Sequence, residues 1–156
     1  MLAQSPDDTH DLSRAIGVDY LVLRAAGEVC ALPVHAISEI LRRPKITPVP
    51  RAGKAIAGIA SVRGAVVTVF DLVEVIDLPR PATKVTGGRV LLIDRGNEKV
   101  GLLVDSVIEV VRIEKDSLEH ASVLGGEPAP HVLAVARPKG SPIILLNERL
   151  LFEGIS

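Results

Sequence analysis

The chain has 156 residues and a formal net charge of −1, with 18 Lys and Arg against 19 Asp and Glu. Hydrophobic residues make up 47% and aromatic residues only 2%, so the core must be aliphatic and no row of rings is available to stack on nucleic-acid bases. Balanced charge gives no electrostatic reason to bind phosphate backbones or anionic membranes. These properties predict no nucleic-acid partner and no direct membrane contact.

Residues 1–16 are acidic and lack the basic and apolar regions of a secretory signal. We therefore predict a flexible N-terminal tail over 1–16, a folded domain over 17–156 and a cytoplasmic location. The single cysteine, Cys30, excludes an internal disulfide and any multi-cysteine metal site, and its apolar surroundings predict a buried thiol.

Strand patterns dominate the first half of the chain. Short β-branched runs cover residues 21–23, 29–32 and 65–70, and the pairs Ala26-Gly27 and Arg63-Gly64 provide hairpin turns. Asp71, followed by Glu74, has the spacing of a helix cap and predicts a short helix that stops before residue 79. Residues 78–88, rich in Pro and Gly, read as a linker.

The second half repeats this order. Apolar runs cover residues 90–93, 99–104, 107–113 and 143–146, with turns at 95–97 and 139–140. Residues 30–43 overlay 100–113 in a register of 70, and residues 67–72 overlay 143–148 in a register of 76. We predict a mainly β protein of two similar halves, 17–88 and 89–156, built as small barrels or a sandwich with a seam between them. Whether strands are exchanged between the halves stays open.

Catalytic motifs are missing from the sequence. The residues around Lys54 and Ser61 fit neither a phosphate-binding loop nor a nucleophile elbow, and the four histidines lack metal-ligand spacing. The sequence therefore predicts no catalytic residue, cofactor or metal. Two alternatives remain: a small ligand-binding or enzymatic barrel that uses His35, Glu39 and Asp105 at the seam, and a nucleic-acid-binding barrel.

Three charged residues have two readings each. Glu39 and Glu109 occupy equivalent places in apolar runs, where a carboxylate either faces solvent on a strand or recognises a partner. Arg63 precedes Gly64 at a tight turn, where its guanidinium is either solvated or fixes a partner's oxygen atoms.

Several sequence blocks resemble the CheW family. They occur in the family's order at residues 34–40, 46–50, 56–64, 67–72 and 101–107, and include G-x-x-x-x-R-G and G-L-L-V-D-x-V patterns. The resemblance runs from about Tyr20 to Phe152. Departures lie at residues 30–33, at residues 61–62 and in the proline-rich stretch 128–142.

The resemblance implies a CheW-like fold of two intertwined, five-stranded SH3-like barrels with short helices. It also implies a non-enzymatic adaptor that links the cytoplasmic tip of a chemoreceptor to the regulatory domain of the histidine kinase CheA, with possible self-association in rings. The family's receptor-binding positions match Ile37, Glu39, Gly58 and Arg63 in this sequence.

Overall fold

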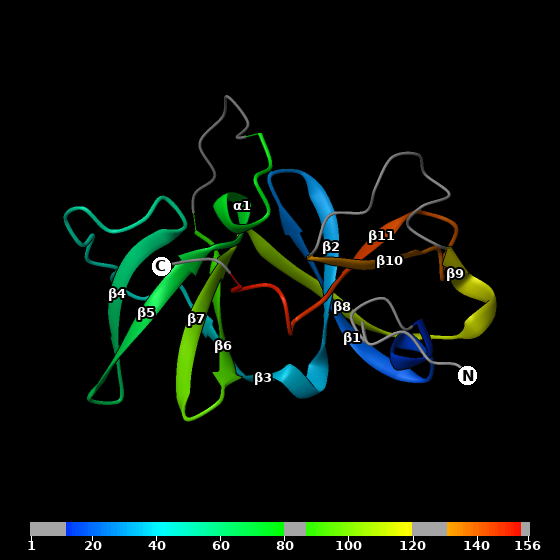
Figure 1. Cartoon of the computed structure of the whole chain (residues 1–156), viewed down its shortest axis with the longest axis horizontal. Helices are drawn as coiled ribbons and strands as arrows, with labels where there is room; N and C mark the ends of the chain where they lie inside the picture. The colour runs from blue at the N-terminus through cyan, green and yellow to red at the C-terminus, as the bar shows by residue number, and fades with distance from the viewer. Residues whose placement is uncertain (1–11, 80–86, 120–130, 154–156) are drawn as a thin grey trace, which may run out of the picture.

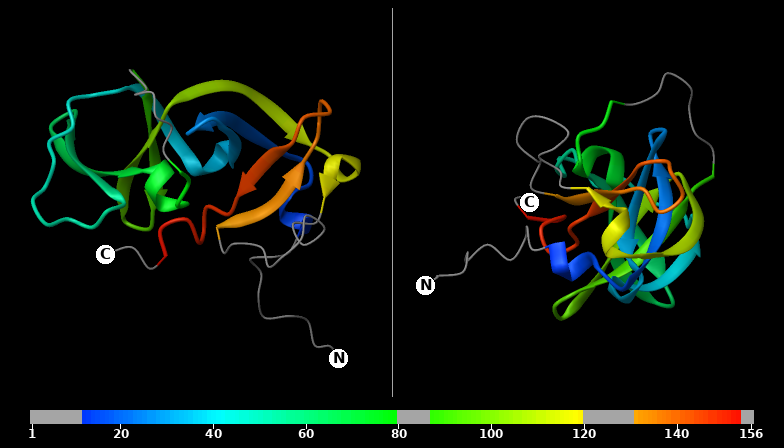
Figure 2. Two further views of the ribbon diagram at one scale, coloured as in Figure 1. Left: turned by 90° about the horizontal axis from the view of Figure 1, so that it is seen from above. Right: turned by 90° about the vertical axis from the view of Figure 1, so that its right-hand side faces the viewer.

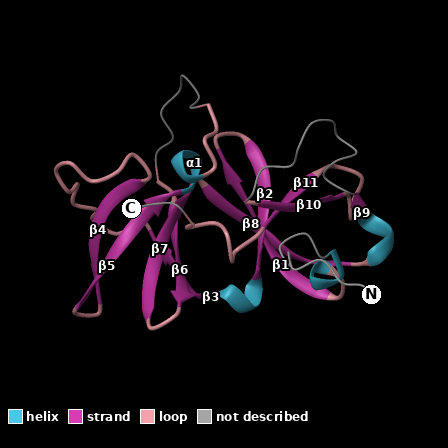
Figure 3. Ribbon diagram, in the orientation of Figure 1, coloured by secondary structure: helices cyan, strands magenta, loops and turns pink. Residues whose placement is uncertain are grey.

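The structure is a computed structural model that describes residues 12–79, 87–119 and 131–153. Strands make up most of it, as Figure 3 shows, and the helical parts are the four-residue helix α1 (Leu72–Val75) and three short 3₁₀ turns. The strands are β1 (Val18–Ala25), β2 (Glu28–Pro33), β3 (Ile37–Arg42), β4 (Ile56–Val62), β5 (Ala65–Asp71), β6 (Arg89–Arg95), β7 (Glu98–Val104), β8 (Ser106–Ile113), β9 (Leu118–Glu119), β10 (Val132–Ala136) and β11 (Ile143–Leu146). Among the described residues, no helix has the length and apolar character needed to cross a bilayer.

The strands form two sheets that lie side by side (Figures 1 and 2). One has the order β8-β1-β2-β11-β10-β9, and the other has the order β3-β6-β7-β5-β4. Strand β3 thus pairs with β6 from the second half of the chain, and β8 pairs with β1 from the first half. The two sheets therefore do not coincide with residues 17–88 and 89–156, because each half contributes strands to both sheets.

Local turn chemistry explains the hairpins. Ala26 and Gly27 have φ angles of 52° and 84°, and Arg63 and Gly64 have φ angles of 50° and 83°. Two consecutive positive φ angles are the geometry of the two-residue turn whose twist matches paired strands. Both predicted turns are therefore present, one joining β1 to β2 and the other joining β4 to β5.

The predicted cap at Asp71 is also present. Its Oδ1 accepts a hydrogen bond from the Val73 amide at 3.1 Å, and helix α1 ends at Val75, before residue 79 as predicted. The second half has an equivalent hydrogen bond, in which Oδ1 of the buried Asn147 accepts from the Arg149 amide at 3.1 Å. Here the chain continues as turns up to residue 153 instead of a helix.

The core is aliphatic, as the composition requires, and its largest cluster spans both halves of the chain. That cluster joins Leu21 and Leu23 to Leu91 and Leu102, and smaller clusters fill the interior of each sheet. Two phenylalanines, Phe70 and Phe152, meet with ring centroids 5.0 Å apart. The two sheets are thus joined by a shared hydrophobic core rather than by a linker alone.

Two expectations need correction. Residues 12–15 form a 3₁₀ turn and Ala15 is fully buried, so the folded body begins before residue 17. Strands β4, β9 and β10 were not predicted; β4 contains Gly58 and several small residues, which have low strand propensity, and its pairing with β5 stabilises it despite that composition. Residues 1–11 of the predicted tail and 80–86 of the predicted linker lie outside the described residues.

Candidate functional site

An apolar groove of about 250 Å³ lies between strands β3 and β8, each of which is the edge strand of its sheet. Its lining is Leu21, Val34, Ile37, Ser38, Glu39, Ile40 and Val110. Large exposed apolar side chains gather here, since Ile40 is 45% exposed and Val110 is 56% exposed. Contiguous exposed apolar surface on a soluble protein marks a site of interaction.

The groove combines equivalent positions of the internal repeat. Ile40 and Val110 are separated by the 70-residue register of the sequence overlay and come from equivalent strands, β3 and β8. Exchange of these two strands between the sheets brings both side chains to the seam. The site therefore exists only because both halves of the chain contribute to it.

Glu39 and Arg63 form an ion pair at the rim of this groove. The two terminal guanidinium nitrogens of Arg63, Nη1 and Nη2, donate to the two carboxylate oxygens of Glu39, in the bidentate arrangement that fixes a planar pair most firmly. Arg63 is held in place by its turn, whereas Glu39 is half-buried on β3. The pair thus links the β4–β5 hairpin to the open edge of the same sheet.

This ion pair changes the titration of Glu39. Hydrogen bonding from Arg63, aided by its charge, lowers the pKa of the Glu39 carboxyl below its ordinary value. A pKa lowered by folding means that the pair stabilises the fold above the ordinary pKa of glutamate. That contribution is lost as the pH falls through the lowered pKa.

A wider cavity of about 560 Å³ lies beside the ion pair, on the sheet formed by β3, β6, β7, β5 and β4. Val62, Val66 and Thr68 line it together with Glu39 and Arg63, and Val66 is the most exposed large apolar side chain described, at 69%. Because Glu39 belongs to both cavities, the ion pair stands between two hollows and can contact a partner seated in either.

Gly58 is placed differently from the other three predicted site residues. It is buried in β4 with a φ angle of 152°, and a Cβ there would collide with the Thr47 carbonyl group and lie 2.9 Å from Cγ2 of Ile46. The close backbone approach that this glycine permits is therefore internal to the chain. The structure brings Ile37, Glu39 and Arg63 together and leaves Gly58 beneath the loop that precedes β4.

The other sheet contains an equivalent ion pair. Nζ of Lys139 donates to Oε1 of Glu109 at 2.7 Å, and both residues match Glu39 and Arg63 in the sequence overlay. Lysine makes one point contact where arginine makes two, so the second pair is less rigid. The repeat has kept the charges at both places, but only the first copy has the bidentate geometry.

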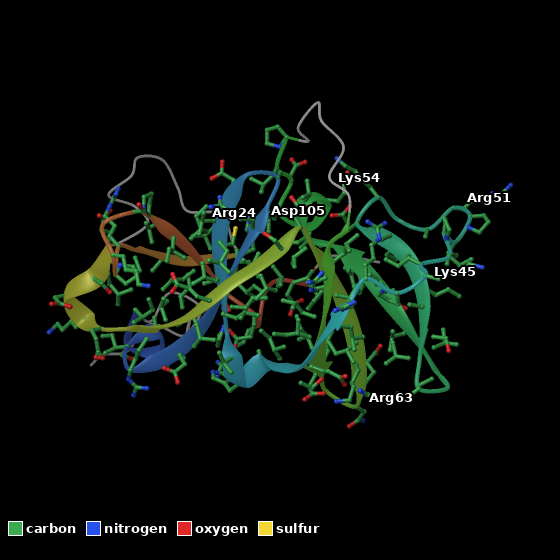
Figure 4. The ribbon with its side chains drawn as sticks, turned by 180° about the vertical axis from the view of Figure 1, so that it is seen from behind. Arg24, Lys45, Arg51, Lys54, Arg63 and Asp105 are labelled. Carbon is green, nitrogen blue, oxygen red and sulfur yellow. The ribbon has the colours of Figure 1, made fainter. Side chains whose placement is uncertain are left out.

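The residues of the enzymatic alternative do not converge. Oδ2 of Asp105 accepts from the Ala26 amide at 2.8 Å, and Figure 4 shows Asp105 near the top of the view and Arg63, the partner of Glu39, near the bottom. Within the described residues, no group of three or more His, Cys, Asp or Glu is arranged to hold a metal. Burial raises the pKa of Cys30 to about 12, so this thiol is a poor nucleophile.

Sequence reasoning missed most of the groove. Val34, Ile40 and Val110 were not singled out. Burial alternates along residues 37–42, so the side chain of Ile40 lies on the more exposed face of β3 and that of Glu39 on the other. The available signal was the repeat itself, because Ile40 and Val110 are equivalent apolar residues on equivalent strands. They differ from core residues only in their exposure to solvent, which is known only from the folded structure.

Comparison with known proteins identifies the family. The sequence model of the CheW-like domain matches residues 19–155. The chain is 26% identical over 96 residues to a chemotaxis protein CheW of Thermotoga maritima, covering 62% of either chain, and 27% identical over 141 residues to protein FrzA of Myxococcus xanthus, covering 86% of this chain and 85% of FrzA. It is also 30% identical over 102 residues to the chemotaxis protein CheA of Salmonella typhimurium, which amounts to 15% of CheA.

A solved structure agrees. The crystal structure of the scaffolding protein TtCheW from Thermoanaerobacter tengcongensis superposes with a TM-score of 0.76 at 25% identity and covers 88% of this chain and 94% of that one. The mainly β fold of two sheets is therefore confirmed. Because the domain match extends over nearly the whole chain and the two folds agree, this protein belongs to the CheW-like domain family.

Proposed function

We propose that the protein is a non-enzymatic, cytoplasmic adaptor that couples chemoreceptors to the histidine kinase CheA. The observation that carries this proposal is the exposed apolar groove at the seam, with the Glu39–Arg63 pair at its rim. A groove of this kind suits a protein partner, because apolar contacts supply the affinity and the charged rim sets the orientation.

The occupant of the groove is the helical cytoplasmic tip of a receptor. An amphipathic helix docks by laying its apolar face into a hydrophobic groove. Ile37, Ile40 and Val110 offer such a surface, and Arg63, fixed by its turn, has further donors for backbone or carboxylate oxygens of the tip. Gly58 acts indirectly in this scheme, because it allows the loop that precedes β4 to pack closely against that strand.

The second partner is the regulatory domain of the kinase. A segment of CheA from Salmonella typhimurium resembles this chain, so adaptor and kinase contain similar bodies. Similar bodies can pack end to end, and repetition of such a contact gives closed rings, to which copies of the adaptor itself can also contribute. Coupling then requires only that the adaptor contacts two states of the kinase with different affinity, without any bond chemistry.

Arg63→Glu tests the receptor role. The substitution places two carboxylates together at the rim, so the affinity for a receptor-tip fragment should fall at least about tenfold, a loss of roughly 1.4 kcal/mol. Binding can be measured by isothermal titration calorimetry with a fragment that contains the helical hairpin tip.

The matched control is Lys139→Glu, which makes the same charge change at the equivalent pair of the other sheet. It should leave tip binding within about twofold, and both variants should unfold near the wild-type temperature. Equal affinities for wild type and a folded Arg63→Glu protein would exclude the groove rim as the receptor contact.

A further inference from the structure

Positive charge is concentrated in one stretch of the chain. Residues 40–70 contain none of the acidic residues, although the whole protein is nearly neutral. The cations of this stretch are Arg42, Arg43, Lys45, Arg51, Lys54 and Arg63. Apart from Arg63, they lie at the end of β3 or in the connection between β3 and β4.

This connection is held rigidly against the edge of β4. Thr47 and Ile59 exchange two backbone hydrogen bonds of 2.8 and 2.9 Å, and the Ala52 amide donates to the Val49 carbonyl at 3.1 Å. Gly58 lets the backbone of Thr47 approach this closely. Order of this kind lowers the entropy lost when such a loop binds a partner.

The outer surface of the loop has an apolar centre and a cationic rim. Pro48, Val49 and Pro50 are all exposed, and Val49 has 40% of its surface open to solvent. Lys45 and Arg51 flank these three residues, and within the described part of the chain neither side chain forms an ion pair. An apolar centre inside a polar rim is the anatomy of a protein interface.

The backbone conformation at Arg51 is a second, independent observation. Arg51 has a φ angle of 63°, a region that a side chain with a Cβ enters at a cost of about 1 kcal/mol. Among the described residues, four non-glycine residues have positive φ, and two of them, Arg51 and Arg63, are arginines at turns of this same sheet. Strained presentation of a charged side chain points to a role outside the fold.

We infer that this loop, residues 45–54, is a second docking surface, and that its partner is an acidic protein surface with an apolar residue that covers Val49. Nucleic acid fits less well, because the chain has few aromatic residues to stack on bases. A lipid bilayer also fits less well, because the loop has no aromatic anchor for the interface.

The surface is separate from the groove. Figure 4 shows Lys45, Arg51 and Lys54 around the outer side of β4, whereas the groove lies at the seam on the other side of that sheet. Both can be occupied together, so the inference goes beyond the receptor site and stands without it. Lys54 is the weakest member, since Glu74 and Asp77 lie 3.5 Å from its Nζ.

The test uses the full-length protein and a short fluorescein-labelled peptide of Glu-Glu-Leu repeats as probe. We expect saturable binding by fluorescence anisotropy, with amide chemical shifts that change in residues 45–54. Reversal of two charges of the loop, Lys45→Glu with Arg51→Glu, should weaken binding at least about tenfold, and Val49→Ser should weaken it about threefold.

The matched control is Lys115→Glu with Arg149→Glu, which makes the same charge change at two exposed residues of the other half. This control should bind the peptide within about twofold of wild type. The inference is overturned by shifts outside the loop, by equal loss in the control, by wild-type affinity in Val49→Ser, or by equal binding of a DNA duplex or phosphatidylserine vesicles to the loop.

Discussion

The glycine at position 58 supports the connection between β3 and β4. A Cβ there would meet the backbone of Thr47, which cannot move aside as the end of a long side chain could. The same backbone is tied to Ile59 by two hydrogen bonds, so a shift at residue 47 also disturbs the edge of β4. A single missing methyl group therefore determines where a basic loop of ten residues sits.

Gly58→Ala should lower the free energy of unfolding by about 2 to 3 kcal/mol, because a methyl group is forced into a packed backbone contact. Urea unfolding followed by circular dichroism measures this loss. Gly64→Ala is the control, since its φ of 83° is strained but nothing lies near its Cβ position, and it should cost about 1 kcal/mol. Equal losses in the two variants would show that conformational strain, and not the contact with Thr47, is what matters.

Edge strands β3 and β8 are the elements that make the site. Each leaves its own half of the chain, pairs with the first strand of the other half and carries one wall of the groove. The corner that leads into β8 is tied to the β1–β2 hairpin, because Asp105 accepts from the Ala26 amide and its own amide donates to the Arg24 carbonyl at 3.0 Å. Asp105 thus sets the start of β8, and the sequence assigned it to catalysis only as an alternative.

Asp105→Ala should destabilise the fold by about 1 kcal/mol, because the Ala26 amide loses its acceptor at a half-buried place. Asp105→Asn keeps a carbonyl oxygen for that amide and should retain most of the stability. Hydrogen exchange at the Ala26 amide gives a local readout, which should quicken in the alanine variant. Wild-type protection of that amide in Asp105→Ala would contradict the assigned role.

At the scale of the whole molecule, strand exchange makes the two sheets depend on each other. Strand β3 has its hydrogen-bonded neighbour in the second half, and the largest core cluster draws on both halves. A scaffold needs this property, because two partners are held at a fixed angle only if the body between them does not bend.

Separate fragments of residues 1–86 and 87–156 should therefore be largely unfolded alone and should regain a native spectrum when mixed. Each fragment lacks the neighbour of an exchanged strand and exposes part of the shared core. Nuclear magnetic resonance of one labelled fragment, before and after addition of the other, measures the recovery. A dispersed spectrum with cooperative unfolding from residues 1–86 alone would mean that this half is an independent domain.

The sequence by itself determined the β class, the repeat, the hairpin turns and the cap at Asp71. These are local properties, set by alternation along a strand and by residues that accept positive φ or bond their own backbone. It also identified Glu39 and Arg63 as candidates, because Glu39 lies in an apolar run and Arg63 lies at a tight turn. The family resemblance added that these residues belong to one site.

Only the tertiary structure decided which residues meet. Strand exchange cannot be predicted from local sequence patterns, since pairing of β3 with β6 joins residues 47 to 56 positions apart and depends on packing of the whole core. For the same reason Ile40 and Val110 could not be told from buried residues, and Gly58 could not be separated from the groove. Exposure and close approach follow from long-range packing, whereas strand period and turn type follow from neighbours along the chain.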